Sequence, residues 1–361
     1  MTGVFFRLDA DARIGIGHLM RCMTIANALR RHGSLCHFLC RELMPSLHDR
    51  VASQGHVVHT VDNEDSALGL MREFRPDWLV VDHYGLDATF ESKAGAFTKS
   101  VLVIDDLADR SHHCDFLLDQ GPLRTPDDYR PWVDPQCQLC LGTDYALVGP
   151  EFKHFCRPYV TSWERGLICF GGADPRNITL AVLQALHSQP RMRRIGWTVI
   201  AGSANPHWRE LKDFTAHSPL DIVLIKHSDR MAELMANHDF AIGAAGGMTW
   251  ERACIGIPTL AIPISDNQLI SAEVIRHFGL GETLDPSALT SPLLVSSLKR
   301  LKQHAHVYRR RSQAMVDGLG ITRLSKILLE IDGAPKWCLS KGDDNDLPAR
   351  GLFYGHESVG L

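Results

Sequence analysis

A single histidine stands at the start of a helix-like segment near the N-terminus. The sequence Gly15-Ile16-Gly17-His18 follows a strand-like run and opens an amphipathic helix that we expect over residues 18–31. A helix N-terminus disfavours an imidazolium ion, so we expect a neutral imidazole near pH 7 with a free nitrogen lone pair. Such a nitrogen can act as a general base. The spacing alone equally allows a histidine that serves only as a polar residue at the helix start.

The glycines around this histidine fit neither of the two common phosphate-binding signatures. In a dinucleotide-binding G-x-G-x-x-G sequence, the third glycine would fall at Met20. A P-loop is excluded as well, because no G-K-[ST] follows. The loop is therefore interpreted as a tight turn that brings the backbone, and His18 with it, close to a ligand.

A second glycine loop, in the sequence GAAGGMTWERACIGIP, indicates an anion site. A strand over 240–242 runs into small residues, and a helix is expected to start near Met248. Free amides at a helix N-terminus suit a diphosphate, and Glu251, one turn further, can accept both hydroxyls of a ribose. The alternative is a close strand–helix crossing with an acid that favours the helix dipole. The nucleotide-binding candidates are Gly246, Gly247, Met248, Thr249 and Glu251.

Polar residues follow several other strand-like runs, at the positions where a parallel sheet gathers its ligand-binding side chains. Asp82, His83 and Tyr84 end one run, and Asp105-Asp106 ends another. Paired aspartates can bind a metal, but we interpret Asp105 as structural or substrate-orienting. In the second half of the chain, four further residues at strand ends are expected to line the substrate site: Gly172, Asn177, Asn267 and Gln268.

Strand-like and helix-like segments alternate along the chain, which predicts parallel sheets covered by helices on both faces. The rhythm restarts near residues 150–165, so we expect an α/β protein of two doubly wound Rossmann-type domains facing each other across a cleft. The N-terminal domain with the histidine loop is expected over 1–155 and a nucleotide-binding domain over 156–333. Long helical patterns at 293–316 and 322–331 close the second half, and an irregular tail covers 334–361.

Composition narrows the range of partners. The chain has 361 residues and a net charge of -4, so nothing attracts it generally to nucleic acid or to an anionic membrane. Its ten cysteines are scattered along a chain too long to need disulfide staples, which indicates reduced thiols in the cytoplasm. No apolar run approaches the length that spans a bilayer, and the N-terminus lacks a signal-peptide core. His112-His113-Cys114 are adjacent in the sequence, and adjacent residues rarely converge on one ion, so neither a metal nor another cofactor is expected.

Taken together, these stretches resemble one family. RLDADARIGIGHLMRCMTIANAL, VVDHYGLD, VIDDLADR, LGTDYALVGPEF, FGGADPRN, GAAGGMTWERACIGIP and SDNQ occur in order over residues 4–280. They resemble the UDP-2,4-diacetamido-2,4,6-trideoxy-β-L-altropyranose hydrolases of pseudaminic acid biosynthesis. The resemblance implies a GT-B fold, like that of the N-acetylglucosaminyltransferase that forms lipid II, and a UDP-sugar substrate.

The resemblance also implies a reaction, namely hydrolysis at the anomeric carbon with inversion. The catalytic histidine of the family's G-x-G-H-x-x-R motif falls on His18, and the same stretch adds Asp9, Gly17 and Arg21 to the expected substrate-binding residues, together with Tyr84 further on. Two features depart from the family. Gly149 stands where an arginine is common, and the tail beyond about residue 333 has no counterpart.

Three alternatives remain open at this stage. A glycosyltransferase would use a hydroxyl acceptor in place of water and share every nucleotide-site residue. A hydrolysing UDP-sugar 2-epimerase would change the configuration at the adjacent carbon. A catalytically silent nucleotide-sugar sensor would bind UDP without turnover, although a histidine beside the loop favours an enzyme.

Overall fold

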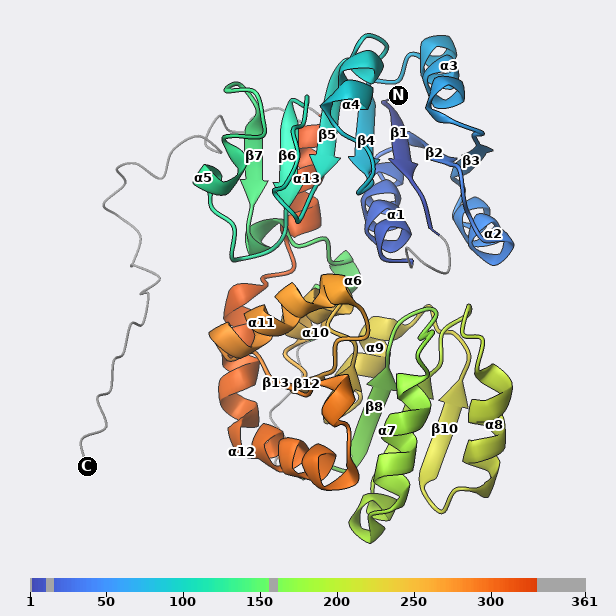
Figure 1. The fold of residues 1–361 in the computed structure, drawn as a ribbon, viewed down its shortest axis with the longest axis vertical. Coiled ribbons are helices and arrows are strands. Elements are labelled where there is room, and N and C mark those ends of the chain that lie inside the picture. The colour runs from blue at the N-terminus through green and yellow to red at the C-terminus, as the bar shows by residue number, and fades with distance from the viewer. Residues whose placement is uncertain (1, 11–15, 156–161, 330–361) are drawn as a thin grey trace, which may run out of the picture.

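The computed structural model describes residues 2–10, 16–155 and 162–329, which form two parallel β-sheets flanked by helices (Figure 1). The first sheet has the strand order β3-β2-β1-β4-β5-β6-β7. Because the order runs outward from β1 in both directions, the sheet is doubly wound. Its strands are β1 (Gly3–Leu8), β2 (Leu35–Cys40), β3 (Val57–Thr60), β4 (Trp78–Asp82), β5 (Ser100–Ile104), β6 (Phe116–Asp119) and β7 (Gln138–Leu141).

The second sheet repeats this plan with the strand order β10-β9-β8-β11-β12-β13. All of its strand pairs are parallel as well. Here β8 is the strand from which the order runs outward. Its strands are β8 (Arg165–Cys169), β9 (Gly196–Ile200), β10 (Asp221–Ile225), β11 (Phe240–Gly243), β12 (Thr259–Ala261) and β13 (Glu282–Thr283).

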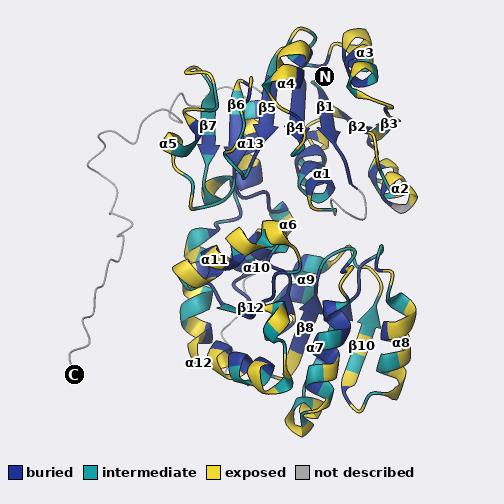
Figure 2. Cartoon of the chain, in the orientation of Figure 1, coloured by how far each residue is buried: buried dark blue, intermediate teal, exposed yellow. Residues whose placement is uncertain are grey.

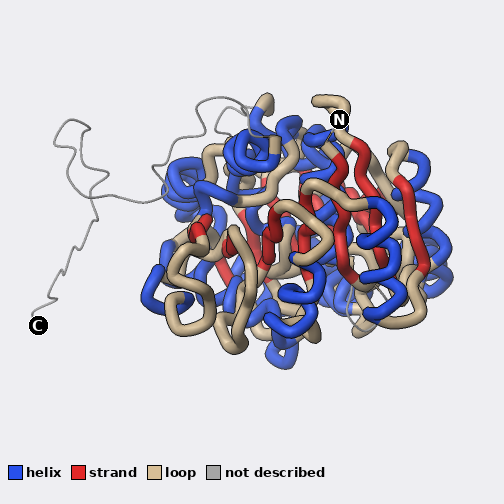
Figure 3. Tube along the Cα trace, turned by 90° about the horizontal axis from the view of Figure 1, so that it is seen from above, coloured by secondary structure: helices blue, strands red, loops and turns tan. Residues whose placement is uncertain are grey.

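Helices cover both faces of each sheet, so that in Figure 3 the strands lie between helical layers. In the first half these are α1 (Gly17–Arg30), α2 (Pro45–Ser53), α3 (Glu64–Phe74), α4 (Ala88–Gly95), α5 (Pro126–Tyr129) and α6 (Pro150–Lys153). In the second half they are α7 (Ile178–His187), α8 (Trp208–His217), α9 (Met231–Ala236), α10 (Met248–Ile255), α11 (Leu269–Phe278), α12 (Ser291–Met315) and α13 (Gly320–Leu328).

The strands are apolar on both faces because each sheet separates two cores (Figure 2). Successive side chains of a strand point to opposite faces. In β1, accordingly, Val4, Phe6 and Leu8 enter the core shared with α1, while Phe5 enters the core on the other face, with α3 and α4. This two-sided burial explains the nearly continuous hydrophobic runs in the sequence.

The last described helix differs from the expectation. The sequence placed residues 322–331 with the second half, but α13 packs against α1 and returns to the first sheet. Ile321, Leu324 and Leu328 are buried in the same core as α1, because their 3–4-residue spacing forms an apolar stripe that matches it. The domain limits stay a prediction, and residues 334–361 lie outside the described part of the chain.

The predicted strands of both halves are present, and three short ones were missed. These are β6, β7 and β13, which have only four, four and two residues. The carboxyl ends of β5, β6 and β7 point down in Figure 1 and those of β8 and β10 point up, so the two carboxyl-terminal edges face each other.

Candidate active site

His18 lies in the first turn of α1 and is held by a carboxylate from the neighbouring strand β4. Its Nδ1 lies 2.5 Å from Oδ1 of Asp82, and both side chains are buried, with Asp82 fully inaccessible to solvent. An acceptor at Nδ1 favours the tautomer that carries its proton there, which leaves the lone pair on Nε2. Among the described residues, nothing bonds that Nε2.

Arg21, one helical turn after His18, fixes the same carboxylate from the other side. Its Nε donates to Asp82 Oδ2 at 2.6 Å and its Nη2 to Oδ1 at 2.5 Å, which is a bidentate pair. Burial alone raises the pKa of Asp82, but the Arg21 guanidinium and His18 outweigh it and hold the pKa well below its usual range. Asp82 is therefore an anion that orients the histidine ring.

Tyr84 and Asp106 extend this cluster toward the second half of the chain. The Tyr84 ring meets His18 edge-on at 4.7 Å between centroids, and its hydroxyl donates to Asp106 at 3.4 Å. Arg21 Nη1 donates to the same Asp106 carboxylate at 3.1 Å. Burial, and then the charge of Asp106, raise the pKa of Tyr84 to about 12. Asn267, which follows β12 of the second sheet, lies near enough to the Tyr84 hydroxyl to lower its pKa in part, against burial and Asp106.

A second contact between the halves joins the histidine loop to the segment that follows β8. Ile16, immediately before α1, packs onto Gly172 after β8, and a Cβ atom added at Gly172 would lie 2.2 Å from Ile16 Cδ1. A larger residue at position 172 would therefore have to displace the end of the Ile16 side chain. Residues 11–15, including Gly15, lie outside the described residues, whereas Gly17 is the exposed first residue of α1.

The predicted diphosphate loop turns from β11 into α10. The Thr249 amide closes the turn by donating to the Gly246 carbonyl at 2.8 Å. Gly247 is exposed, and a side chain there would meet no atom within 4 Å. Gln268 lies beside the loop, with Nε2 3.4 Å from a Cβ built at Gly246, while its Oε1 accepts from the Ile264 amide at 3.1 Å. Met248, which begins α10, contacts Cys169 at the end of β8 with 3.8 Å between the sulfur atoms.

Glu251 lies in the first turn of α10. Within the described part of the chain its carboxylate has no hydrogen-bond partner, although it is only partly exposed. Burial raises its pKa to about 7, with a further contribution from the Glu151 charge and an opposing one from Arg252. An unpaired carboxylate on this turn is suited to accept hydroxyl groups of a ligand.

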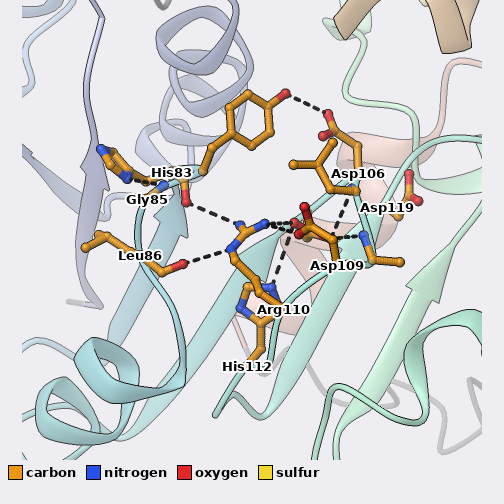
Figure 4. Close-up of polar contacts among 12 residues, drawn as sticks. His83, Gly85, Leu86, Asp106, Asp109, Arg110, His112 and Asp119 are labelled. Carbon is orange, nitrogen blue, oxygen red and sulfur yellow. Dashed lines mark hydrogen bonds and ion pairs between the residues drawn. The ribbon is translucent and has the colours of Figure 1, made fainter.

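Three of the predicted binding residues make contacts within the protein. Asp105 is buried: its carboxylate accepts from the Leu107 and Ala108 amides and pairs with Arg110 at 2.8 Å. Arg110 also donates to the His83 and Leu86 carbonyls, so it holds the segment that carries Tyr84 in place (Figure 4). These contacts fit the structural interpretation of Asp105, and its partly exposed neighbour Asp106 is the carboxylate that lies beside Tyr84 and Arg21.

The Asp9 carboxylate is also occupied by hydrogen bonds within the protein. Arg7 donates to it at 2.9 Å, the Arg41 amide at 2.7 Å and His83 Nε2 at 3.1 Å, and Asp9 is 5% exposed. Burial raises its pKa, but the His83 and Arg7 bonds outweigh that effect and hold it well below the usual range. Asp9 therefore ties the β2–α2 connection to β1 and is not available to a substrate.

Asn177 lies at the start of α7, and its Nδ2 donates to Glu210 in the first turn of α8 at 2.8 Å. The first turn of α7 is capped by the buried Asp174, which accepts from the Ile178 and Thr179 amides at 2.9 and 2.8 Å. A carboxylate therefore already occupies this helix N-terminus. The FGGADPRN sequence does contain this aspartate, which is a common helix-capping residue.

The HHC sequence is divided among three structural contacts. His112 Nδ1 meets Glu91 at 2.8 Å, His113 meets Asp134, and Cys114 lies 3.7 Å from the Cys137 sulfur. Within the described ranges, no group of three or more His, Cys, Asp or Glu side chains is placed to hold a metal ion. None of the helices described there is long and apolar enough to cross a membrane.

The buried His112 should make stability depend on pH. Burial lowers the pKa of His112, but the carboxylates of Asp105 and Glu91 outweigh that effect and raise the pKa to about 9. Because the pKa is raised in the folded state, this contribution is complete below about 6.5 and is lost as pH rises through 9. We expect up to about 3 kcal/mol of unfolding free energy to disappear over that interval. Urea unfolding at pH 6.5 and at pH 9.5 measures this change in unfolding free energy. His112→Gln should abolish the change, whereas the control His113→Gln, at an exposed histidine, should retain it.

Comparisons with known proteins agree with this geometry. Residues 168–324 match the profile of the glycosyltransferase family 28 C-terminal domain. The chain is 27% identical over 278 residues to the UDP-2,4-diacetamido-2,4,6-trideoxy-beta-L-altropyranose hydrolase of Campylobacter jejuni, covering 76% of this chain and 97% of that one. It is 25% identical over 345 residues to the spore coat polysaccharide biosynthesis protein SpsG of Bacillus subtilis, covering 91% and 98%. The resemblance expected from the sequence is confirmed.

The crystal structure of Acinetobacter baumannii MurG superposes with a TM-score of 0.64 at 15% identity, over 92% of this chain and 100% of that one. The chain has the GT-B fold. The predicted fold class is thereby confirmed. In this GT-B structure, the family 28 match contains the β11–α10 glycine loop and Glu251, whereas His18, Asp82 and Arg21 lie on the first sheet, opposite that match.

Proposed function

We propose that this protein hydrolyses a UDP-linked 2,4-diacetamido-2,4,6-trideoxy sugar at the anomeric carbon, releasing UDP and the free sugar for nonulosonic acid biosynthesis. The observation that carries the proposal is the 2.5 Å contact between His18 Nδ1 and the Asp82 carboxylate on the sheet edge that faces the glycine loop. The hydrolase of Campylobacter jejuni, to which the chain is 27% identical, supports the sugar and the reaction.

The buried pair accounts for general-base catalysis. With its proton on Nδ1, His18 offers the Nε2 lone pair to a water molecule. As the water attacks the anomeric carbon, Nε2 takes its proton and the ring becomes an imidazolium ion. Asp82, which Arg21 keeps ionised and in position, stabilises that ion. Attack from the side opposite the leaving group inverts the anomeric configuration.

The leaving UDP is expected to bind at the second sheet. Cleavage at the anomeric carbon passes through an oxocarbenium-like state, so stabilising the departing diphosphate lowers the barrier. The amides of Gly246, Gly247 and Met248 and the Thr249 hydroxyl would contact the diphosphate, and Glu251 the ribose. Tyr84, Asn267 and Gln268 lie between the histidine and this loop, where they would contact the sugar.

An assay without any acceptor tests the proposal. The protein is incubated with a panel of UDP-diacetamido sugars, and UDP and the sugar product are followed by NMR, with and without EDTA. We expect stoichiometric UDP and free sugar, the original configuration at C2, and no loss of rate in EDTA. Tight UDP binding without any turnover would contradict the proposal and favour a nucleotide-sugar sensor.

The match to a glycosyltransferase family 28 domain favours one alternative, transfer of the sugar to a hydroxyl acceptor. A transferase would share the nucleotide loop and differ at the acceptor side. It would release UDP rapidly only when an acceptor is present. A hydrolysing 2-epimerase would instead be recognised by a changed configuration at C2 of the product.

Glu251 gives a separate, pH-dependent prediction for nucleotide binding. If its carboxylate accepts the ribose hydroxyls, Glu251→Gln should weaken UDP binding about tenfold at pH 8, where the group is ionised. At pH 5.5 the wild-type carboxyl is mostly protonated, because its pKa is about 7, and the difference should narrow to a few-fold. Calorimetry at both pH values measures the ratio of affinities, in which the titration of UDP itself cancels. Equal affinities at pH 8 would exclude this role.

A further inference from the structure

A positive charge is buried beneath the glycine loop of the second sheet. Arg252 follows Glu251 in α10 and is only 3% exposed. Its Nη2 donates to the Ala244 carbonyl at 2.5 Å and to the Thr249 hydroxyl at 3.4 Å, and both acceptors belong to the turn between β11 and α10. Among the described residues its Nε has no hydrogen-bond partner and no carboxylate forms an ion pair with it.

Such a guanidinium is unusual inside a protein. Burial lowers its pKa to about 10, so it still carries its charge at neutral pH. A buried charge without an opposite partner is costly, and proteins rarely keep one unless a ligand or a network compensates it. The charge of Glu251, the adjacent acid, raises the pKa of Arg252 in part, but among the described residues the two side chains form no hydrogen bond or ion pair.

The charge lies directly behind the loop expected to hold the diphosphate. A Cβ atom added at Gly243 would lie 2.6 Å from Arg252 Nη1 and 2.4 Å from the Cys169 carbonyl oxygen, so glycine makes room for the guanidinium there. Because the Thr249 oxygen accepts from Arg252, its own proton is free to point elsewhere. The arginine thus prepares a hydroxyl donor and a positive field on the same side of the turn.

We propose that Arg252 stabilises the bound diphosphate of a nucleoside diphosphate from beneath the β11–α10 loop, without contacting the ligand itself. It does so through its positive charge and by orienting the Thr249 hydroxyl toward the diphosphate. This inference rests on the proposed nucleotide site. It adds to that site a residue that favours ligands with a negatively charged diphosphate. UDP provides the anion that no carboxylate of the described residues provides. Uridine, which lacks the diphosphate, should gain nothing from Arg252.

Binding of UDP and of uridine to variants of the full chain tests this inference. Arg252→Gln retains a donor for the Ala244 carbonyl but removes the charge, and Arg252→Lys retains the charge. We expect the Gln variant to bind UDP at least about tenfold more weakly while uridine affinity changes less than about threefold. The Lys variant should bind UDP within a few-fold of the wild type.

Two controls keep the test decisive. If Arg252→Gln does not fold, Thr249→Val in the wild-type background examines the same path, and it too should weaken UDP several-fold more than uridine. Equal loss of UDP and uridine affinity in the variant would show a merely structural arginine and overturn the inference. A wild-type protein that binds no UDP would overturn the proposed function as well, so the two failures are distinguishable without measuring turnover.

Discussion

His18→Asn is expected to lose turnover by about 10²–10⁴-fold while UDP affinity stays within a few-fold of the wild type. This loss corresponds to roughly 2.7–5.4 kcal/mol of activation free energy. Asparagine has a similar size and is tolerated at a helix start, so stability should change little. The nucleotide loop lies on the other sheet, which is why binding should survive. Steady-state kinetics and calorimetry on the same preparation separate the two effects.

The pH–rate profile adds an internal control for this variant. The acidic limb of the wild-type profile should disappear in His18→Asn, because the group whose protonation it reports is gone. A variant with near-normal turnover would show that His18 only begins the helix. The base would then have to be sought among the other groups that face this point, of which Asp106 is the partly exposed one.

Asp82→Asn is expected to cost at least about 10²-fold in turnover, although Asp82 touches no substrate. The amide is isosteric but uncharged, so it no longer stabilises the imidazolium ion that forms when His18 takes the proton. The groups that face His18 are then Arg21 and Tyr84, with Asp106 behind them. We therefore expect the acidic limb of the rate profile to move to lower pH, which a purely structural role would not cause.

A matched variant controls for the loss of a buried carboxylate. Asp239 precedes β11 and is 6% exposed, and it accepts from the Glu164 and Arg165 amides on the second sheet. Asp239→Asn should leave the rate and its pH profile unchanged. Because Asp82→Asn leaves Arg21 without its partner, UDP affinity and thermal melting are measured as checks of folding. An Asp82→Asn protein with the wild-type rate profile would contradict the orienting role.

The two glycine loops and the strand ends could be predicted from the sequence because they are local features. A strand, a run of small residues and a helix follow one another directly, and parallel strands bring their carboxyl ends to one edge. The contact of Ile16 with Gly172 and the proximity of Asn267 to Tyr84 connect loops that the sequence analysis had selected independently.

What the sequence could not show is how buried charges pair. Asp105 and Asp106 are neighbours in the sequence. Asp105 nevertheless pairs with Arg110 and accepts from two backbone amides, whereas Asp106 accepts from the Tyr84 hydroxyl. Asp9, similarly, is occupied by Arg7 and His83. Such pairings depend on side chains that lie far apart in the sequence.

The packing partners of helices could not be predicted from the sequence either. The apolar stripe of α13 predicts that the helix packs on something, but not which sheet. The position of Arg252 next to Glu251 on one helix likewise gave no sign that its guanidinium turns beneath the glycine loop. One signal was present, namely a charged residue among the small and apolar residues of GAAGGMTWERACIG.

Hydrolysis in ¹⁸O-labelled water tests most directly whether water, activated by His18, attacks the anomeric carbon. The label is best followed in UDP by ³¹P NMR, because the hemiacetal oxygen of the free sugar exchanges with solvent. We expect UDP without ¹⁸O, together with a first-formed sugar of inverted anomeric configuration, and product formation that is about 10²–10⁴-fold slower in His18→Asn. One ¹⁸O atom in the terminal phosphate of UDP would show attack at phosphorus and contradict this mechanism.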